Sequence, residues 1–302
     1  MDKIVSILKP TGMTSHDAVS IVRRITGIRK VGHTGTLDPD AAGVLPICIG
    51  RATKVSELIL NKEKSYLCEL TLGASTDTYD SSGEIIFKAE ENFDYNEEKI
   101  RKAFDTQRGE IDQYPPKYSA LKVNGKKMCD LVRKGREDEI VLKPRKVNIK
   151  KLEIISIDGN KVRFYTECSK GTYIRSICHD IGEILGCGGH MSFLLRTSSG
   201  KFNLENSITL DELEKYKDEG TMEDYMFDID FTLDSYGSLE LQDNAVKYYT
   251  NGGIIESYRF SKKDYNKDDE LVRVYSHERF LGIGKLRREG NKVSVKSEKI
   301  FV

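Results

Sequence analysis

The spacing of apolar residues along the chain switches repeatedly between a helical and a strand-like period. Helical spacing predicts helices over residues 14–27, 96–107 and 172–185. The first of these has the residues of a capping box, because Thr14 stands three positions before Asp17. Glycines end the first segment and follow the third, and a glycine there can adopt the left-handed conformation that terminates a helix.

Strict alternation of side chains predicts strands elsewhere. Residues 66–73 place every second side chain on one mostly apolar face, which is typical of a strand with one buried face. Residues 144–168 contain two alternating stretches that meet at Asp-Gly-Asn, residues 158–160, and this pattern predicts a hairpin. Residues 31–50 are punctuated by glycine and proline, and we expect an ordered loop with little regular structure there.

The 302 residues carry no net charge, but their charges are unevenly distributed. Residues 108–175 hold 17 basic and 9 acidic side chains, a net charge of +8, whereas residues 211–240 hold 2 basic and 11 acidic ones, a net charge of −9. The basic segment suits either a phosphate-contacting lobe or a merely solvated surface, and its composition leaves both open. The acidic segment leads to a boundary near residue 237, beyond which the chain is rich in strand patterns. We therefore expect two domains, residues 1–237 and 238–302.

Composition narrows the class of protein further. The sequence has no run of about 18 apolar residues, so we expect no membrane-spanning helix. None of the six cysteines forms a CxxC pair, and a chain of this length needs no disulfide staples, which indicates a reducing, cytoplasmic location. Cys178, His179, Cys187 and His190 could be considered as zinc ligands, but their spacing fits no structural zinc pattern.

The candidate chemistry lies in VGHTGTLDPDAAGVLPICIGRATK, residues 31–54. Asp38 stands there between Leu37 and Pro39, and the proline biases it toward an extended backbone. A carboxylate that a rigid loop presents against an apolar wall suits a nucleophile or an acid–base group. The alternative is an ordinary Pro-Asp turn, in which Asp40 caps a short helix.

Arg175 is a second candidate because of its place at the start of a predicted helix. The helix dipole disfavours a cation in the first turn, so a carboxylate partner is expected. Asp38 is a reasonable partner, since a guanidinium can hold a carboxylate ionised and oriented. The alternative is an exposed arginine on the polar face of the helix, beside Ser176 and His179.

Five segments together resemble the ordered motifs of the TruB family of tRNA pseudouridine synthases. They are KPTGMTSHD at 9–17, GHTGTLDPDAAGVLPICIGRATK at 32–54, YLCELTLGASTDTYDSSG at 66–83, PPKYSALKVNG at 115–125 and CSKGTYIRSICHDIGEILGCGGHMSFLLRTSSGKF at 168–202. One departure follows the fourth motif, where relatives commonly carry an aromatic residue and this chain has Met128-Cys129.

This resemblance implies an α+β chain with the pseudouridine synthase fold, a mixed and largely antiparallel sheet flanked by helices. It also implies an inserted RNA-gripping lobe at about residues 115–146 and a small PUA-like RNA-binding β-domain at 238–302. The implied reaction isomerises uridine 55 in the T-loop of transfer RNA to pseudouridine, on a nucleotide extruded from its stack. No cofactor, metal or obligate protein partner is expected, because bond making and breaking stay within one nucleotide.

The resemblance assigns three residues to the chemistry. Asp38 occupies the place of the family's catalytic aspartate, which either attacks C1′ or abstracts the ribose 2′ proton. Tyr66 matches the tyrosine that stacks on the target base and is a candidate for deprotonating C5, although a plain strand aromatic would look the same. Arg175 matches the arginine that pairs with the aspartate.

Five more positions match family residues that bind the substrate or support the site. They are His33 against the flipped nucleotides, Tyr173 and Leu194 in the pocket wall, Lys9 under the opening motif, and Asp80 as a polar contact in the loop after the strand. A turn-capping role for the histidine, and core packing for the tyrosine and the leucine, are the structural alternatives.

Two other functions remain open from the sequence. A guide-RNA-dependent relative of the dyskerin type shares the aspartate motif but works inside a multi-protein particle, and the short segment before Lys9 and the small tail argue against it. An RNA chaperone or binding module without catalysis is disfavoured by the intact set of Asp38, Tyr66 and Arg175.

Overall fold

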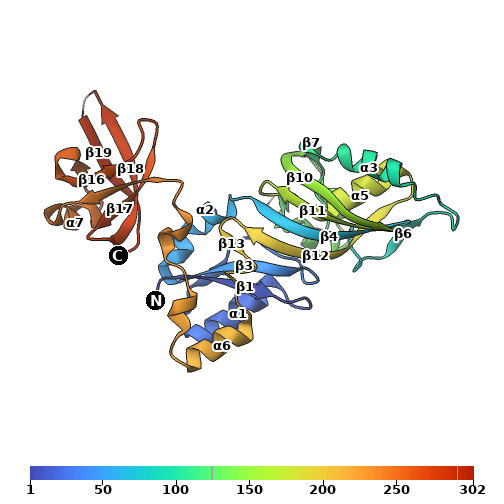
Figure 1. Ribbon diagram of the computed structural model, residues 1–302, viewed down its shortest axis with the longest axis horizontal. Helices are drawn as coiled ribbons and strands as arrows, with labels where there is room; N and C mark the ends of the chain where they lie inside the picture. The colour runs from blue at the N-terminus through green and yellow to red at the C-terminus, as the bar shows by residue number, and fades with distance from the viewer. Residues whose placement is uncertain (124, 291) are drawn as a thin grey trace.

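The computed structural model describes residues 1–123, 125–290 and 292–302. The strands of its larger sheet are β1 (Ile4–Lys9), β2 (Val31–His33), β3 (Ala42–Ile49), β4 (Lys64–Leu72), β7 (Gly109–Gln113), β10 (Arg145–Asp158), β11 (Lys161–Cys168), β12 (Gly189–Ser199) and β13 (Phe202–Asn203). They run in the order β1-β3-β12-β4-β11-β10-β7, with β2 beside β3 and β13 beside β12 (Figure 1). These pairings are antiparallel except that of β3 with β12, so the expected mixed, largely antiparallel sheet is confirmed.

The expectation of a loop over residues 31–50 is wrong for most of that segment. Only residues 34–41 and Gly50 lie outside β2 and β3, and residues 34–41 form the connection that carries Asp38. Strand β3 lies between β1 and β12 with almost every side chain buried, so pairing on both edges overrides the turn preference of its glycine and proline. Gly43 is required at this junction, because a Cβ atom there would lie 2.2 Å from the carbonyl oxygen of Arg196.

The predicted helices are present with their caps. They are α1 (Ser15–Thr26), α3 (Glu97–Asp105) and α5 (Ile174–Leu185), and α6 (Leu210–Asp218) lies in the acidic segment. Thr14 and Asp17 form the expected capping box, and Gly27 and Gly186 adopt the left-handed conformation at the C-terminal caps. In Figure 1, α1 and α6 lie side by side next to β1, while α3 and α5 lie at the other half of the sheet.

Within the described ranges, no helix combines the length and the apolar character needed to cross a membrane.

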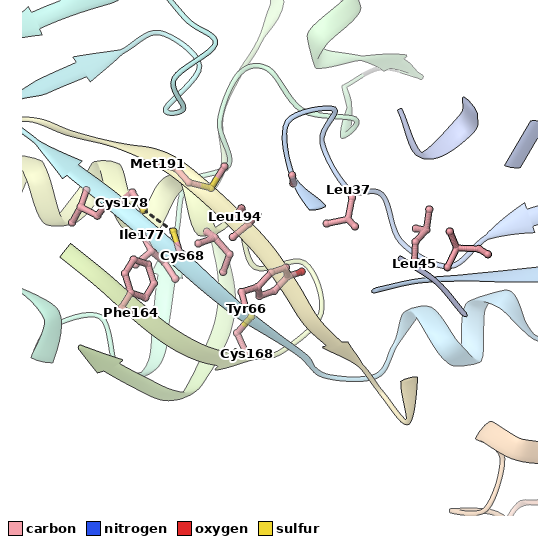
Figure 2. Packing of buried hydrophobic residues seen from close by; sticks show 14 of the residues in the cluster. Leu37, Leu45, Tyr66, Cys68, Phe164, Cys168, Ile177, Cys178, Met191 and Leu194 are labelled. Atoms are coloured by element: carbon pink, nitrogen blue, oxygen red, sulfur yellow. Dashed lines mark hydrogen bonds between the residues drawn. The ribbon is translucent and has the colours of Figure 1, made fainter. Parts of the chain in front are cut away.

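One buried cluster ties helix α5 to the sheet. Tyr66, Cys68 and the alternate residues after them on β4 are buried, as the strand pattern predicts. The sulfur of Cys68 lies 3.7 Å from that of Cys178 on α5, and Phe164 of β11 packs in the same cluster (Figure 2). The core therefore fixes β4 and α5, which carry two of the three candidate catalytic residues, relative to each other.

Two small additions extend from the larger sheet. The hairpin β5 (Ala74–Thr76) and β6 (Ile85–Lys88) follows β4, and the loop between its strands contains Asp80. The basic lobe of residues 115–146 contains β8 (Lys122–Val123), β9 (Lys126–Lys127), α4 (Met128–Val132) and the 3-10 turn η2 (Glu137–Glu139). Met128 is buried in the lobe and its thioether accepts a weak hydrogen bond from Ser119 Oγ.

The C-terminal residues form a second, separate sheet, which confirms a small C-terminal β-domain. Its order is β15 (Ile254–Glu256), β19 (Lys292–Ile300), β18 (Arg279–Glu289), β17 (Leu271–Ser276), β14 (Gly237–Leu241) and β16 (Phe260–Asp264), with helix α7 (Asp243–Thr250). The short helical turns η3 (Met222–Tyr225) and η4 (Ile229–Thr232) connect the two parts. Two others, η1 (Gly50–Val55) and α2 (Ser56–Leu60), lie between β3 and β4 of the larger sheet, and η5 (Ser257–Arg259) lies between β15 and β16 of the second sheet. Ile283 and Phe301 pack into one cluster with Ile4 and Val44, so the two parts share a hydrophobic contact. Arg51 reinforces it by donating from Nη1 to the Phe301 carbonyl oxygen at 2.6 Å.

Candidate active site

The loop that carries Asp38 is fixed on its N-terminal side by Ser15, the first residue of α1. The Ser15 hydroxyl donates to the Leu37 carbonyl oxygen at 2.9 Å and accepts from the Leu37 N–H at 2.8 Å. Ser15 is buried, so neither bond competes with water. Both backbone groups of the residue before Asp38 are therefore held, and a two-way contact of this kind has no sequence signal.

Lys9 fixes the same loop on its C-terminal side. Its ammonium donates to three carbonyl oxygens, those of Pro10 at 2.7 Å, Met13 at 2.8 Å and Pro39 at 3.2 Å. The side chain is almost fully buried, and burial lowers the pKa of Lys9 to about 8 although the charge of Asp38 opposes that shift. The expectation that Lys9 supports the opening motif agrees with these contacts, which also reach the residue after Asp38.

Arg175 bridges two carboxylates. Its Nη2 lies 3.1 Å from Asp38 Oδ2, and its Nη1 lies 3.1 Å from Asp80 Oδ2. Nη1 also donates to the Thr78 carbonyl oxygen and Nη2 to that of Tyr118, each at 3.1 Å. The pair inferred from the helix dipole is therefore present, and the alternative of an exposed arginine is wrong, since only 8% of the Arg175 side chain is exposed.

Asp38 remains open to solvent on one side, with 40% of its side chain exposed. Burial of its other side raises the pKa of the Asp38 carboxyl, while the Arg175 cation opposes that shift and Asp80 adds to it. A carboxylate that is partly desolvated yet oriented by a guanidinium is well placed to act on a substrate arriving from the open side. The geometry thus fits a nucleophile or base better than the turn-forming alternative.

Tyr66 and Leu194 lie on neighbouring strands beside this loop. Each is 7% exposed, and Figure 2 shows their side chains on β4 and β12, with Leu37 of the Asp38 loop beyond them. Burial raises the pKa of the Tyr66 phenol to about 12, and the charge of Arg196 opposes that shift. The phenol is therefore protonated at neutral pH in the absence of a substrate.

Arg196 also belongs to this site, although the sequence contains no signal for it. It stands directly opposite Tyr66 in the antiparallel pairing of β12 with β4, and it is 1% exposed. Its guanidinium donates to the carbonyl oxygens of Val44 at 2.6 Å, Gly35 at 3.3 Å and Thr36 at 3.4 Å. It therefore connects the strand of Tyr66 to the loop of Asp38, and because its acceptors are backbone oxygens, no residue pattern indicates it.

Three candidates remain to be placed, namely His33, Tyr173 and Asp80. His33 ends β2, and its pKa is lowered by burial and by the nearby charge of Arg196. Tyr173 is the N-cap residue of α5, and the side-chain amide of Gln113 both accepts from its N–H and donates to its carbonyl oxygen. The carboxylate of Asp80 is 14% exposed, and its Oδ2 accepts a hydrogen bond from Nη1 of Arg175 at 3.1 Å.

The residues considered as zinc ligands do not come together in one site. Cys178 points to Cys68 in the core, His179 stacks on Tyr79, and His190 Nδ1 contacts the Ala74 carbonyl oxygen. In the described part of the chain, no group of three or more His, Cys, Asp or Glu side chains has the arrangement of a metal site.

Comparison with known proteins gives a consistent result. Residues 23–174 match the family model described as TruB family pseudouridylate synthase, N-terminal domain, and residues 175–234 match tRNA pseudouridylate synthase B, C-terminal domain. The chain is 68% identical to tRNA pseudouridine synthase B of Clostridioides difficile strain 630 over 302 residues, the whole of both chains. It is 47% identical to tRNA pseudouridine synthase B of Alkaliphilus oremlandii, with 96% of this chain and 94% of the relative covered.

Among solved structures, the chain is similar to one from an H/ACA RNP bound to a substrate RNA containing 2′-deoxyuridine. The TM-score is 0.75 at 27% sequence identity, and the match covers 99% of this chain and 85% of the other. The expected pseudouridine synthase fold is confirmed by this likeness together with the family models.

Proposed function

Since the chain belongs to the TruB family of pseudouridine synthases, we propose that it converts uridine 55 in the T-loop of transfer RNA to pseudouridine, with Asp38 as the catalytic carboxylate. The observation that carries this proposal is the Arg175–Asp38 ion pair at 3.1 Å, which lies near enough to Tyr66 that, besides burial, the charge of Asp38 raises the pKa of its phenol. An oriented carboxylate that is open on one side and near an aromatic ring supports chemistry on an extruded nucleotide.

The reaction moves the base without adding or removing atoms overall. The bond between N1 and C1′ breaks, the uracil turns, and a bond forms between C5 and C1′ while the proton on C5 moves to N1 by way of the site. Asp38 either attacks C1′ or removes the 2′ proton, and Tyr66 is the candidate acceptor for the C5 proton once its own phenol proton has passed to N1. This balance requires no oxidant, reductant or cofactor.

The other residues act on the extruded nucleotide in this proposal. Leu194 and Tyr173 form walls of the pocket, and His33 lies against the flipped nucleotides. The low pKa of His33 keeps its ring neutral at pH 7, so it contacts the bases by hydrogen bonding and stacking rather than by charge. A cytoplasmic location is part of the proposal and is supported by six unpaired thiols.

The decisive experiment uses the purified chain with a transcript of the T-stem and T-loop and no other protein or RNA. Pseudouridine mapping is expected to show conversion at position 55 and at no other uridine of the loop. Conversion that requires a guide RNA would instead place the chain with the H/ACA-type enzymes. RNA binding without any conversion would make it a binding module.

Tyr66→Phe is expected to lower the rate of pseudouridine formation by about 10²-fold or more, because the ring still stacks but the proton acceptor is removed. RNA affinity should change little. The measurement is a single-turnover rate at saturating RNA. Tyr165→Phe is the matched control, since its hydroxyl bonds to Glu167 on the neighbouring strand β11. Normal turnover by Tyr66→Phe would remove this residue from the proton transfer.

The domain division expected from the sequence, residues 1–237 and 238–302, completes the proposal. The two sheets share no strand among the described residues, which supports a PUA-like RNA-binding domain that follows a catalytic one. The lobe of residues 115–146 would bind the RNA near the site, since its ten basic side chains are exposed, among them Lys117, Lys122, Lys126, Lys127, Arg133, Lys134 and Arg136. Deleting 238–302 is a poor test, because it would uncover the cluster that Phe301 shares with Val44.

The lobe is tested by salt dependence. The double variant Lys126→Gln/Lys127→Gln is expected to weaken RNA binding and to flatten the plot of log affinity against log salt by about one unit for each phosphate that is no longer neutralised. Lys215→Gln/Lys217→Gln on α6 removes the same charge from the acidic segment and should leave the slope unchanged. An unchanged slope in the lobe variant would mean that the basic segment is only a solvated surface.

A further inference from the structure

Tyr79 has a backbone conformation that its sequence neighbours do not explain. Its φ is +65°, and in the described residues only two other non-glycine residues, His277 and Glu278, share a positive φ. Those two form the tight connection between Ser276 and Arg279 of a hairpin, where such angles are normal. Tyr79 lies instead in the loop between β5 and β6, one residue from Asp80. A bulky residue in this region is strained and persists only where its surroundings hold it.

The strained conformation has a visible consequence at Arg175. The residues on either side of Tyr79 both contact the same nitrogen, since Nη1 of Arg175 donates to the Thr78 carbonyl oxygen and to Asp80 Oδ2, each at 3.1 Å. Tyr79, in the left-handed conformation, turns the chain between them. The Thr78 carbonyl oxygen and the Asp80 carboxylate therefore face the same nitrogen. With Nη1 held in this way, Nη2 is directed at Asp38.

His179 holds Tyr79 in place. The two rings are stacked with centroids 3.8 Å apart and planes 7° from parallel. Arg175 and His179 are four residues apart on α5, so one face of the helix presents the guanidinium to the loop's oxygens and the imidazole to its ring. His179 Nδ1 is buried and makes no hydrogen bond within the described chain, so the visible contribution of this side chain is its flat face.

The backbone of this loop is anchored to β12 on both sides of Asp80. The Met191 N–H donates to the Tyr79 carbonyl oxygen, and the Ser81 N–H donates to the Met191 carbonyl oxygen, each at 3.0 Å. These bonds fix the backbone around Tyr79 but leave its side chain free to turn. The stack with His179 sets the orientation of the ring, so the backbone and the side chain of Tyr79 are held by different contacts.

We propose that His179 and Tyr79 are positioning residues that hold the Thr78–Asp80 turn against Arg175 and thereby orient Asp38. This inference rests on the proposed function of Asp38, and neither residue is expected to touch the RNA. Loss of the stack should loosen one end of the guanidinium and so misdirect the carboxylate, which affects the chemical step rather than binding.

The test compares His179→Ala with His179→Phe. The alanine variant removes the stack and is expected to lower kcat for pseudouridine formation by about tenfold with KM changed less than twofold. The phenylalanine variant keeps a flat ring and should restore kcat to within twofold of the unmodified chain. Tyr79→Gly combined with His179→Ala should cost no more than His179→Ala alone, because the two act as one unit. Tyr225→Ala is the control, since it removes the equally close stack with Tyr216, 3.7 Å apart and away from the site.

A second measurement separates this inference from the proposed function. Carbon NMR of chain labelled at aspartate carboxyls, with the Asp38 signal assigned by its loss in Asp38→Asn, follows protonation of Asp38 without any RNA. His179→Ala should raise the midpoint of that titration and His179→Phe should restore it. An unchanged midpoint together with unchanged kcat would overturn the inference, as would equal impairment by alanine and phenylalanine. If the unmodified chain makes no pseudouridine while the midpoint still moves, the proposed function fails and the positioning role stands.

Discussion

Asp38→Asn is expected to abolish pseudouridine formation, with a loss of at least about 10⁴-fold in single-turnover rate. The amide keeps the size of the carboxylate but can neither attack C1′ nor take a proton from the ribose. RNA affinity should stay within a few-fold of the original, because the lobe and the pocket walls are unchanged. The measurements are a rate at saturating RNA and a binding constant under the same salt.

The structure also predicts that this variant folds normally. Burial raises the pKa of Asp38, so the folded chain holds this charge at a cost, and a neutral amide removes that cost. The thermal midpoint of Asp38→Asn should therefore equal or slightly exceed that of the original chain. Asp40→Asn, two residues away in the same loop and exposed, is the matched control and should keep full activity. A rate near the original in Asp38→Asn would overturn the assignment of the catalytic residue.

The pH dependence follows from the same shift. A raised pKa means that Asp38 takes up a proton at a higher pH than an ordinary aspartate, whose value is about 3.9. Activity should therefore fall on the acidic side as the carboxylate is neutralised, and the decline should begin above the range expected for an unperturbed aspartate. A single-turnover rate measured against pH checks this.

Arg175→Lys is expected to lower the rate by roughly 10²- to 10³-fold although the charge is retained. A single ammonium cannot span Asp38 and Asp80, which Arg175 contacts through two different nitrogens. It also cannot satisfy the carbonyl oxygens of both Thr78 and Tyr118. Asp38 and Asp80 would then no longer share a bridging cation. Because the cation opposes protonation of Asp38, the pKa of Asp38 should rise.

The measurements for Arg175→Lys are the rate at saturating RNA and the midpoint of the acidic limb of the pH–rate profile. The midpoint should move to higher pH, which a general loss of stability would not cause. Arg24→Lys is the matched control, because its guanidinium pairs with Glu214 at 3.2 Å on the exposed side of α1. A fully active Arg175→Lys enzyme would show that the two-carboxylate bridge is dispensable.

Elements with local signals can be predicted from the amino-acid sequence alone. The capping box at Thr14, the alternating face of β4 and the two-residue turn between β10 and β11 depend on neighbours a few positions apart, and each is present as predicted. The dipole argument at Arg175 also identified Asp38 as its partner, because a misplaced cation implies a nearby anion.

How the loop of Asp38 is held depends on contacts between distant parts of the chain. The glycine and proline of β3 predict a loop because their preferences act locally, whereas β1 and β12 pair with this strand from distant parts of the chain. That loop is held by hydrogen bonds from Ser15, Lys9 and Arg196 to its backbone carbonyl oxygens, and Ser15 also accepts from a backbone N–H. Backbone groups of this kind do not depend on the side chain of the residue that carries them. No pattern of side chains indicates such contacts, so the roles of Ser15 and Arg196 are found only in the folded chain.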